Sequence, residues 1–319
     1  MRANSKAVFA KSSTIMILLF IALFIFFSVA SRHFFAVGNI MNLFAQMVEL
    51  GLLTLAMAVS MISGGMDLSI GTLCSFCTVL LAIFISQLAL PAGIAIVLVL
   101  LIALLCGALN GFFVGYLHIT PMLVTLGTQS LFLGLGLVVS KGVTVSIPID
   151  QLAIFGRYKI GGVFPFQILL FIAAIIFSVI LFNHSRTGRR IYLIGSDAEV
   201  ARFAGIDIRN NLLFTYVFSS FMAFAAALVI ASRISSGRAD VASARILQTV
   251  CAAVFGGVST LGGIGTIGGA MLGVAVITIV SNGIDMLQVS QFLQQIITGG
   301  MLLIVLAFRH ARKNNLGIA

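Results

Sequence analysis

The sequence predicts an all-α, polytopic membrane protein: a helical bundle with about ten spans, two similar halves and Gly-broken helices. Hydrophobic residues make up 61% of the 319 residues, and charged residues only 8%. The segment from Leu68 to Ser140 holds 73 consecutive residues without Asp, Glu, Lys or Arg. Because a water-facing surface needs charge, this composition excludes a soluble domain. We therefore expect residues 1–319 to form a single transmembrane domain.

The spans are located by windows that contain no or few charges and are long enough, at ~20 residues, to cross a bilayer. They are residues 12–31, 40–62, three helices within 68–140, 160–185, 210–232, two helices within 246–284, and 286–308. Pro91 and the segment 118–121 divide the long charge-free block into its three helices.

Lys and Arg residues predict the orientation of these spans. With ten spans, both termini lie on one side, and that side carries eleven of the cations against seven on the other. We therefore expect a multi-pass membrane protein with both termini in the cytoplasm. The net charge of +10 is divided into short groups between apolar runs. This distribution is typical of orientation signals and does not indicate nucleic-acid binding.

Two Gly-rich, Ser/Thr-bearing interruptions, residues 63–71 and 256–265, lie in corresponding places of the two halves. Interrupted helices in matching positions favour a transport site built on a repeat. The alternative is that the glycines only allow helices to pack closely.

Polar residues inside apolar runs are the candidates for a substrate pathway. A carboxylate in hydrocarbon costs roughly 3 kcal/mol on insertion scales, so Asp67 needs water or a partner. It either caps the helix that starts near Ser69 or lines a polar pathway, and Glu49 with Gln46 one turn earlier is similar. Amides act as interhelical contacts or line a cavity, and they suit a neutral polyhydroxylated ligand. The candidate pathway residues are Asp67, Ser69, Asn110, Gln129 and Asn282.

The polar segment 183–209 predicts a short surface helix over residues 197–204. Ser196 and Glu199 have the spacing of a capping box, Asp197 adds favourable charge in the first turn, and Gly205 ends the helix. A helix this short needs a docking surface, either on this chain or on a partner. The candidate coupling residues are Arg189, Arg190, Ser196, Glu199, Arg202 and Phe203.

Motifs for catalysis are absent from the sequence. It contains no phosphate-binding loop of the type that grips ATP and no metalloprotease or hydrolase signature. Cys74 and Cys77 lie in an apolar run and are best explained as small packing residues. We therefore expect no enzyme activity, no cofactor and no metal site.

Five ordered motifs resemble those of a known family. They are residues 64–71 (Gly-Gly-Met-Asp-Leu-Ser-Ile-Gly), 107–111 (Gly-Ala-Leu-Asn-Gly), 119–128, the segment 186–195 continuing to 201–206, and 255–266. From about residue 39 to 308, the chain resembles the permease subunit of bacterial, binding-protein-dependent ABC importers for ribose, xylose, arabinose and related sugars.

This resemblance implies a sugar permease of the bacterial inner membrane, surrounded by membrane lipid. It would work with a cytoplasmic ATP-binding subunit, a periplasmic solute-binding protein and a second permease subunit. The segment 183–209 would then be the coupling loop. The family usually has Glu-Leu-Asp-Ala-Ile-Ala ahead of the second Gly-rich motif, where this chain has 246–251, with Ile246 and Gln248 at the acidic positions. The difference leaves an atypical ligand open, such as a nucleoside or another furanose-like solute, and also a heterodimer of permeases. A stand-alone proton-coupled transporter or channel is the alternative function.

Overall fold

The computed structural model describes residues 2–290 except 163, together with 293, 294, 296, 297, 299, 300 and 303. Its longer helices are α1 (Arg2–Ala30), α2 (Val37–Ile62), α3 (Ile70–Ala82), α4 (Ala92–Gly115), α5 (Pro121–Ser140), α7 (Gln167–Val179), α10 (Ile208–Ile234) and α12 (Ile267–Met286). The shorter helices are η1 (Ile83–Gln87), α6 (Ala153–Gly156), η2 (Ile180–His184), α8 (Arg186–Ser196), α9 (Ala198–Phe203) and α11 (Arg245–Phe255).

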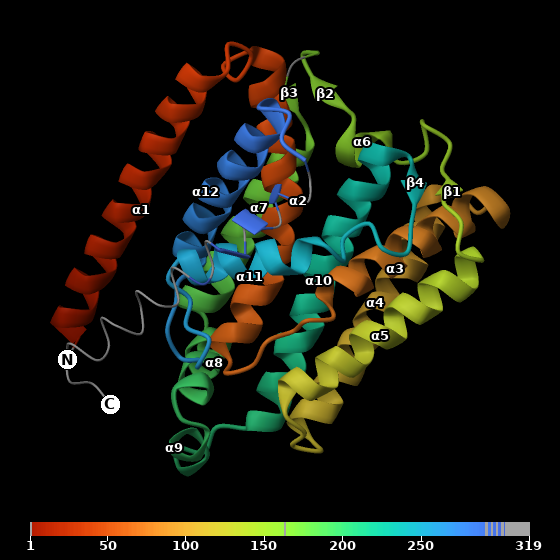
Figure 1. The fold of residues 1–319 in the computed structure, drawn as a ribbon. Helices are drawn as coiled ribbons and strands as arrows, with labels where there is room; N and C mark the ends of the chain where they lie inside the picture. The colour runs from red at the N-terminus through yellow and green to blue at the C-terminus, as the bar shows by residue number, and fades with distance from the viewer. Residues whose placement is uncertain are drawn as a thin grey trace.

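Four strands of two residues each complete the described structure. Strand β1 (Val145–Ser146) pairs antiparallel with β4 (Ser236–Gly237), and β2 (Lys159–Ile160) pairs antiparallel with β3 (Phe164–Pro165). These pairs lie at the end of the bundle opposite α9 (Figure 1). Apart from these short strands, the regular structure of the described residues is helical, so the fold is an all-α membrane bundle, as the sequence predicts.

Seven helices in the described part of the chain are long and apolar enough to cross a membrane. Three of them, Ile70–Gln87, Ala92–Gly115 and Pro121–Ser140, confirm the division of the charge-free block. The prediction of two spans within 246–284 is wrong. Helix α11 has 11 residues and so rises only about 16 Å, about half of a ~30 Å hydrocarbon core. The predicted span 286–308 falls mostly outside the described residues.

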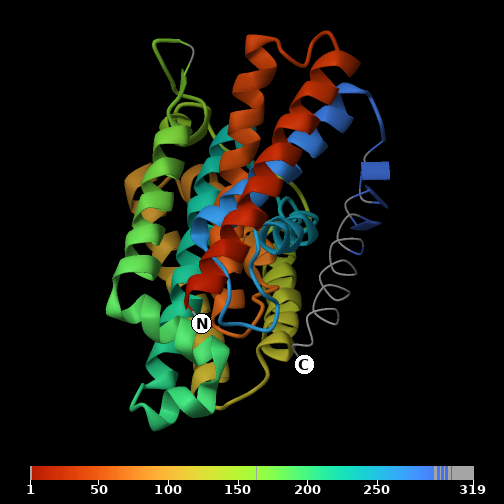
Figure 2. The same cartoon turned by 90° about the vertical axis from the view of Figure 1, so that its left-hand side faces the viewer.

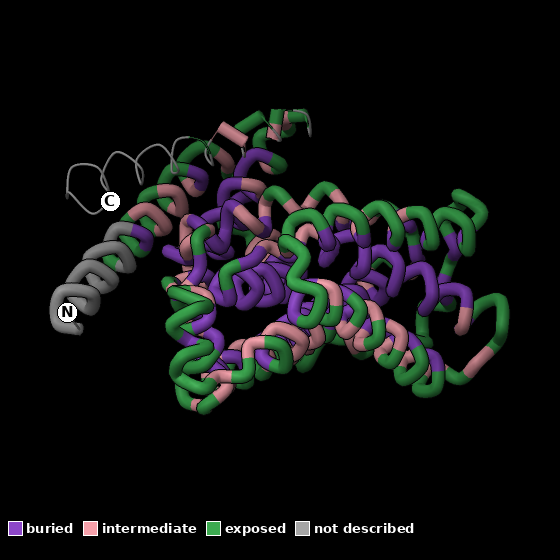
Figure 3. Tube along the Cα trace, turned by 90° about the horizontal axis from the view of Figure 1, so that it is seen from below, coloured by how far each residue is buried: buried purple, intermediate pink, exposed green. Residues whose placement is uncertain are grey.

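The core of the bundle is formed by α2, α3 and α10, whose residues are largely buried. Helix α10 packs along both α4 and α2, and α3 packs against α5. Seen from the α9 end, buried residues gather in the centre and exposed residues form the rim (Figure 3). Large apolar side chains on α4, α5 and α7 remain exposed, which is the pattern expected for helices that face lipid.

Helix α11 lies across the bundle rather than along it. It crosses in front of α2 and α10 in Figure 1 and is seen nearly end-on after the 90° turn of Figure 2. The helix packs against α12 and α2. Its buried face consists of small residues, among them Ala252 and Ala253, which allow close approach in a crossed packing.

Candidate functional site: a polar cavity and a surface helix pair

The break between α2 and α3 holds the first predicted group. Asp67 is fully buried, and its carboxylate accepts hydrogen bonds from the Ser69 amide (3.1 Å), the Ser69 hydroxyl (2.6 Å) and the Ser219 hydroxyl (2.9 Å). The Asn110 amide donates to the Ser69 hydroxyl at 2.9 Å. The structure therefore brings Asp67, Ser69 and Asn110 together, and this network joins α3, α4 and α10. Ser69, not Asp67, occupies the N-cap position of α3.

The other two predicted pathway residues lie elsewhere. Asn282 on α12 is fully buried and exchanges two amide hydrogen bonds of 3.0 Å with Asn39 on α2. Gln129 is half-buried on α5. None of the five predicted pathway residues lines the two polar cavities described below.

A buried ion cluster joins α2, α10 and α11. Glu49 is fully buried, and its carboxylate forms ion pairs with Arg233 at the end of α10 and with Arg245 at the start of α11. The Arg245 guanidinium lies 2.9 Å from Glu49 Oε2, and an Arg233 N–H donates to the same oxygen at 3.1 Å. Both guanidiniums are partly exposed, by 31% and 26%. Glu49 thus fixes both ends of the connection between α10 and α11.

A polar cavity of about 480 Å³ opens beside this cluster. Its lining comes from α2, α10, α11, α12 and adjoining segments: Gln46, Leu50, Arg233, Val241, Ala244, Arg245, Gln248, Thr278, Ser281, Asp285, Val289 and Gln294. Amide, guanidinium, hydroxyl and carboxylate groups therefore converge on one space between spanning helices. This combination can hydrogen-bond a small polar solute.

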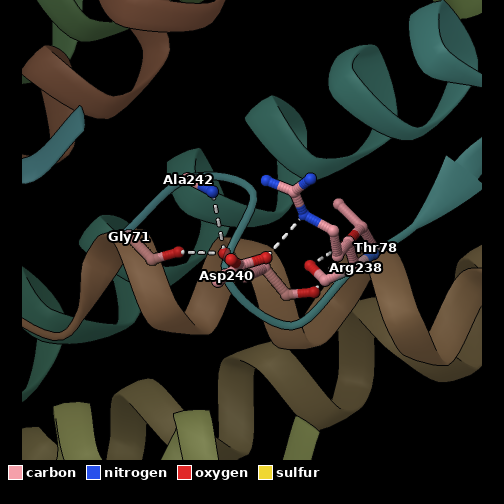
Figure 4. A network of polar contacts seen from close by, with 6 residues as sticks. Gly71, Thr78, Arg238, Asp240 and Ala242 are labelled. Atoms are coloured by element: carbon pink, nitrogen blue, oxygen red, sulfur yellow. Dashed lines mark hydrogen bonds and ion pairs between the residues drawn. The ribbon is translucent and has the colours of Figure 1, made fainter. Parts of the chain in front are cut away.

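The connection from α10 to α11 is held against α3 along its length. The Ser75 hydroxyl accepts a hydrogen bond from the Ala242 amide (3.0 Å) and donates to the Gly71 carbonyl (2.9 Å). Further along, the Thr78 hydroxyl accepts from the Arg238 amide at 3.4 Å. Figure 4 shows this network with the exposed Arg238–Asp240 ion pair, whose atoms lie 2.5 Å apart. These hydrogen bonds fix the α10–α11 connection to α3, beside the polar cavity.

Helices α8 and α9 form the surface element at the other end of the bundle (Figure 1). The Ser185 hydroxyl caps α8, and the Asp197 carboxylate caps α9 by accepting from the amides of Glu199 (2.9 Å) and Val200 (3.0 Å). The predicted capping role of Ser196 is wrong, because this residue ends α8 and its hydroxyl donates to the Tyr192 carbonyl. Helix α9 ends before Gly205, whose φ is +74°.

The predicted coupling residues all lie exposed on this helix pair. They are Arg189, Arg190 and Ser196 on α8, and Glu199, Arg202 and Phe203 on α9. Phe203 is 90% exposed, an unusual state for a phenylalanine side chain. The side chain of Ala201 is buried and holds α9 to the rest of the chain. An exposed aromatic beside cations is typical of a surface that binds another protein.

The two Gly-rich breaks meet at the end of α8. The Gly263 amide donates to the Ile62 carbonyl at 2.9 Å, and a Cβ on Gly262 would lie 2.7 Å from Gly64 Cα. Gly195 of α8 is packed against both breaks, because a Cβ there would clash with the Ile62 carbonyl and the Gly263 amide. A second cavity, of about 460 Å³, lies beside this junction and includes Ser196 and Arg202 in its lining.

Tyr192 adds a hydrogen bond to this junction. Its hydroxyl donates to the Gly265 carbonyl at 2.9 Å, and burial raises the pKa of Tyr192 to about 12. The phenol therefore keeps its proton at physiological pH and remains a donor. The end of α8 therefore contacts both breaks, through the Gly195 backbone and the Tyr192 hydroxyl.

The sequence did not identify Arg233, Arg245 and Asp285 as site residues. The first two were counted only as orientation signals, although Glu49 in an apolar run required a countercharge. Gln248 was singled out because of its difference from the family motif, and the structure places it in the polar cavity.

Comparison with known proteins agrees with the motifs. Residues 39–306 match the family described as branched-chain amino acid transport system / permease component. The autoinducer 2 import system permease protein LsrD of Photorhabdus luminescens is 28% identical over 289 residues, which cover 89% of this chain and 86% of that protein. LsrD of Salmonella typhi is 28% identical and LsrD of Yersinia enterocolitica 27%, each covering 83% of this chain and 81% of the relative. No solved structure matches the chain. The family model covers most of the chain, so the resemblance to importer permeases is confirmed and this protein belongs to this family of transport-system permease components.

Proposed function

We propose that this chain is the subunit through which a bacterial importer moves a pentose or a similar small sugar or polyol from periplasm to cytoplasm, driven by a separate ATPase. The observation that carries the proposal is the polar cavity between α2, α10, α11 and α12. Its volume of about 480 Å³ lies within the ~300–1,000 Å³ of small-molecule sites.

The charges around the cavity favour a neutral solute. Arg233, Arg245 and Asp285 of α12 belong to the lining, and buried Glu49 pairs with the two guanidiniums. Two cations and two carboxylates leave the site close to neutral. Guanidinium and amide N–H groups donate to sugar oxygens, and Asp285 accepts from sugar hydroxyls, so a ligand with several hydroxyl groups suits the site.

Gln248 is the residue that most directly affects which ligand enters. An amide both donates and accepts, whereas the family's acid at this position only accepts when ionised. This difference keeps a nucleoside or another furanose-like solute as the alternative ligand. Autoinducer 2 is a third ligand to test, because the relatives are named for its import.

The helix pair α8–α9 would bind the ATPase. Support comes from exposed Phe203, from the neighbouring cations, and from the backbone contacts of Gly195 with both Gly-rich breaks. In this proposal the network of Asp67, Ser69 and Asn110 holds the first break, so that movement of α8 is passed to α3, α4 and α10. The α9 end faces the cytoplasm, a second permease subunit completes the membrane part, and a periplasmic protein delivers the solute.

Uptake by proteoliposomes tests the proposal. The chain is reconstituted with its ATPase, binding protein and second permease subunit, and uptake of ribose, xylose, arabinose, a nucleoside and autoinducer 2 is measured with and without ATP. We expect ATP-dependent uptake of at least one solute and a loss of about tenfold in Gln248→Ala, the effect of losing roughly one hydrogen bond to the solute. Gln151→Ala, in an exposed loop, is the matched control. Uptake by the single chain that ignores ATP would instead support a proton-coupled transporter or channel.

A further inference from the structure

An apolar cavity of about 370 Å³ lies between α7 and α10, away from the polar cavity. Leu52 of α2 forms part of its wall, Phe155 of α6 lies at one end, and Phe177 and Phe221 lie at the other. Every residue of the lining is apolar. The gap exists because α7 packs on α2, where Phe171 fills the space beside Gly51, while α6 packs on α10.

The surroundings of this cavity indicate an occupant from the bilayer. The cavity is bounded by helices that are long and apolar enough to span, and Phe177 and Phe221 are 49% and 37% exposed. Water is disfavoured in a lining without polar groups. Along α10 the lining extends from Phe221 to Val229, a rise of about 12 Å. That rise is about four fifths of the ~15 Å depth of one leaflet's hydrocarbon, so the cavity accommodates most of one acyl chain.

Positive charge lies at the α6 end of the cavity. Gly156 packs against the α10 backbone at Val229 and Arg233, so α6 closes the cavity there. Arg157 follows and is exposed, with two N–H groups donating to the Arg233 carbonyl at 3.2 Å. Lys159 on β2 is also exposed, and the nearest acid along the chain is exposed Asp150, since residues 151–168 contain no Asp or Glu. The headgroup region beside the cavity is therefore cationic.

We propose that the groove between α7 and α10 is a binding site for an anionic phospholipid. One acyl chain lies in the apolar cavity, and the phosphate lies beside Arg157 and Lys159 in the leaflet opposite α9. Each cation at a membrane surface raises the local concentration of an anionic lipid on the order of fivefold. Together they select the lipid by charge, while the cavity holds its chain. The inference does not depend on which solute the importer carries.

The absence of tryptophan from the sequence allows a direct test with single-tryptophan reporters. Phe221→Trp places the reporter in the cavity, and Ile176→Trp on exposed α7 surface is the matched control. Each variant is placed in vesicles with increasing fractions of brominated phosphatidylglycerol or brominated phosphatidylcholine, and fluorescence quenching is recorded. We expect half-maximal quenching of Phe221→Trp at an at least fivefold lower fraction of phosphatidylglycerol than of phosphatidylcholine. Ile176→Trp should respond equally to both lipids.

Charge variants complete the test. In the Phe221→Trp background, Lys159→Gln should reduce the preference for phosphatidylglycerol, and Arg157→Gln with Lys159→Gln should abolish it. Leu170→Trp, also in the lining, replaces the reporter if Phe221→Trp does not fold. Equal quenching by the two lipids would overturn the proposal, and so would a preference that survives removal of both cations.

Discussion

Replacement of Glu49 by Gln tests whether the buried ion cluster holds α11 in place. The fully buried carboxylate pairs with Arg233 and Arg245, so its loss leaves two guanidiniums without a countercharge. Breaking a buried ion pair by removing one partner costs about 3–5 kcal/mol. The guanidiniums keep 31% and 26% exposure toward the cavity, and glutamine retains the shape and one acceptor. We therefore expect a loss of about 2 kcal/mol in the free energy of unfolding, equivalent to roughly thirtyfold in the equilibrium constant.

The assay is reversible unfolding in lipid–detergent micelles with added sodium dodecyl sulfate, followed by far-UV circular dichroism. Asp240→Asn is the matched control, because Asp240 pairs with Arg238 on the surface with both side chains more than half exposed. Such exposed pairs contribute less than about 1 kcal/mol. A Glu49→Gln variant that unfolds within about 0.5 kcal/mol of wild type would refute the reasoning, as would an equal loss in Asp240→Asn.

Three further predictions concern the helix pair α8–α9 and the interhelical amides. Asp197→Ala should remove the α9 cap, lower helix stability by about 1 kcal/mol and weaken ATPase binding in pull-down assays. Asp240→Ala, an exposed residue outside the helix pair, should leave binding at the wild-type level, and equal effects would contradict the assigned cap. Gly195→Ala should reduce the yield of folded protein, because the added Cβ would clash with backbone atoms of both breaks. Gly268→Ala should be tolerated, because a Cβ there has no neighbour within 4 Å. A normal yield of Gly195→Ala would contradict the close contact at this position. Asn282→Leu should lower the unfolding free energy by about 1–2 kcal/mol, because two reciprocal hydrogen bonds with Asn39 are lost and the half-buried Asn39 amide keeps only its bond to the Phe34 carbonyl. An unchanged value in the same micelle assay would show that this pair contributes little.

The three helices of 68–140 could be predicted because proline and left-handed residues interrupt the apolar run. His118 has a φ of +54°, and Pro121 follows at the first turn of α5. Proline ends or begins a helix through its own local geometry, so the sequence alone locates a break of this kind.

The segment 246–284 could not be divided correctly from its length. Its 39 residues suit two short spans, but the Gly-rich stretch 256–266 uses eleven of them outside any helix. Hydropathy measures apolar content and not direction, so it does not distinguish a short helix lying across the bundle from a span.

The ion cluster could not be predicted from the sequence, for a different reason. Arg233 and Glu49 are 184 residues apart, and nothing in either local pattern identifies the partner. The cap residue of α9 was predicted wrongly because the sequence did not show where α8 ends. Ser196 and Asp197 are both good capping residues, but Ser196 is the last residue of α8, so Asp197 caps α9. Arg202 and Phe203 lie exposed on α9, and their role in coupling stays a prediction.

The central claim is that energy reaches this permease through α9 on the cytoplasmic side, and cysteine labelling at Phe203 tests it most directly. Phe203→Cys in a Cys106→Ser background is exposed to a membrane-impermeant maleimide in spheroplasts and in inverted vesicles. Cys106→Ser alone is the blank, because Cys106 is half-buried whereas Cys74, Cys77 and Cys251 are buried. We predict labelling only in inverted vesicles and protection when the ATPase subunit is bound. Labelling in intact spheroplasts, or labelling that the bound ATPase does not reduce, would contradict the account.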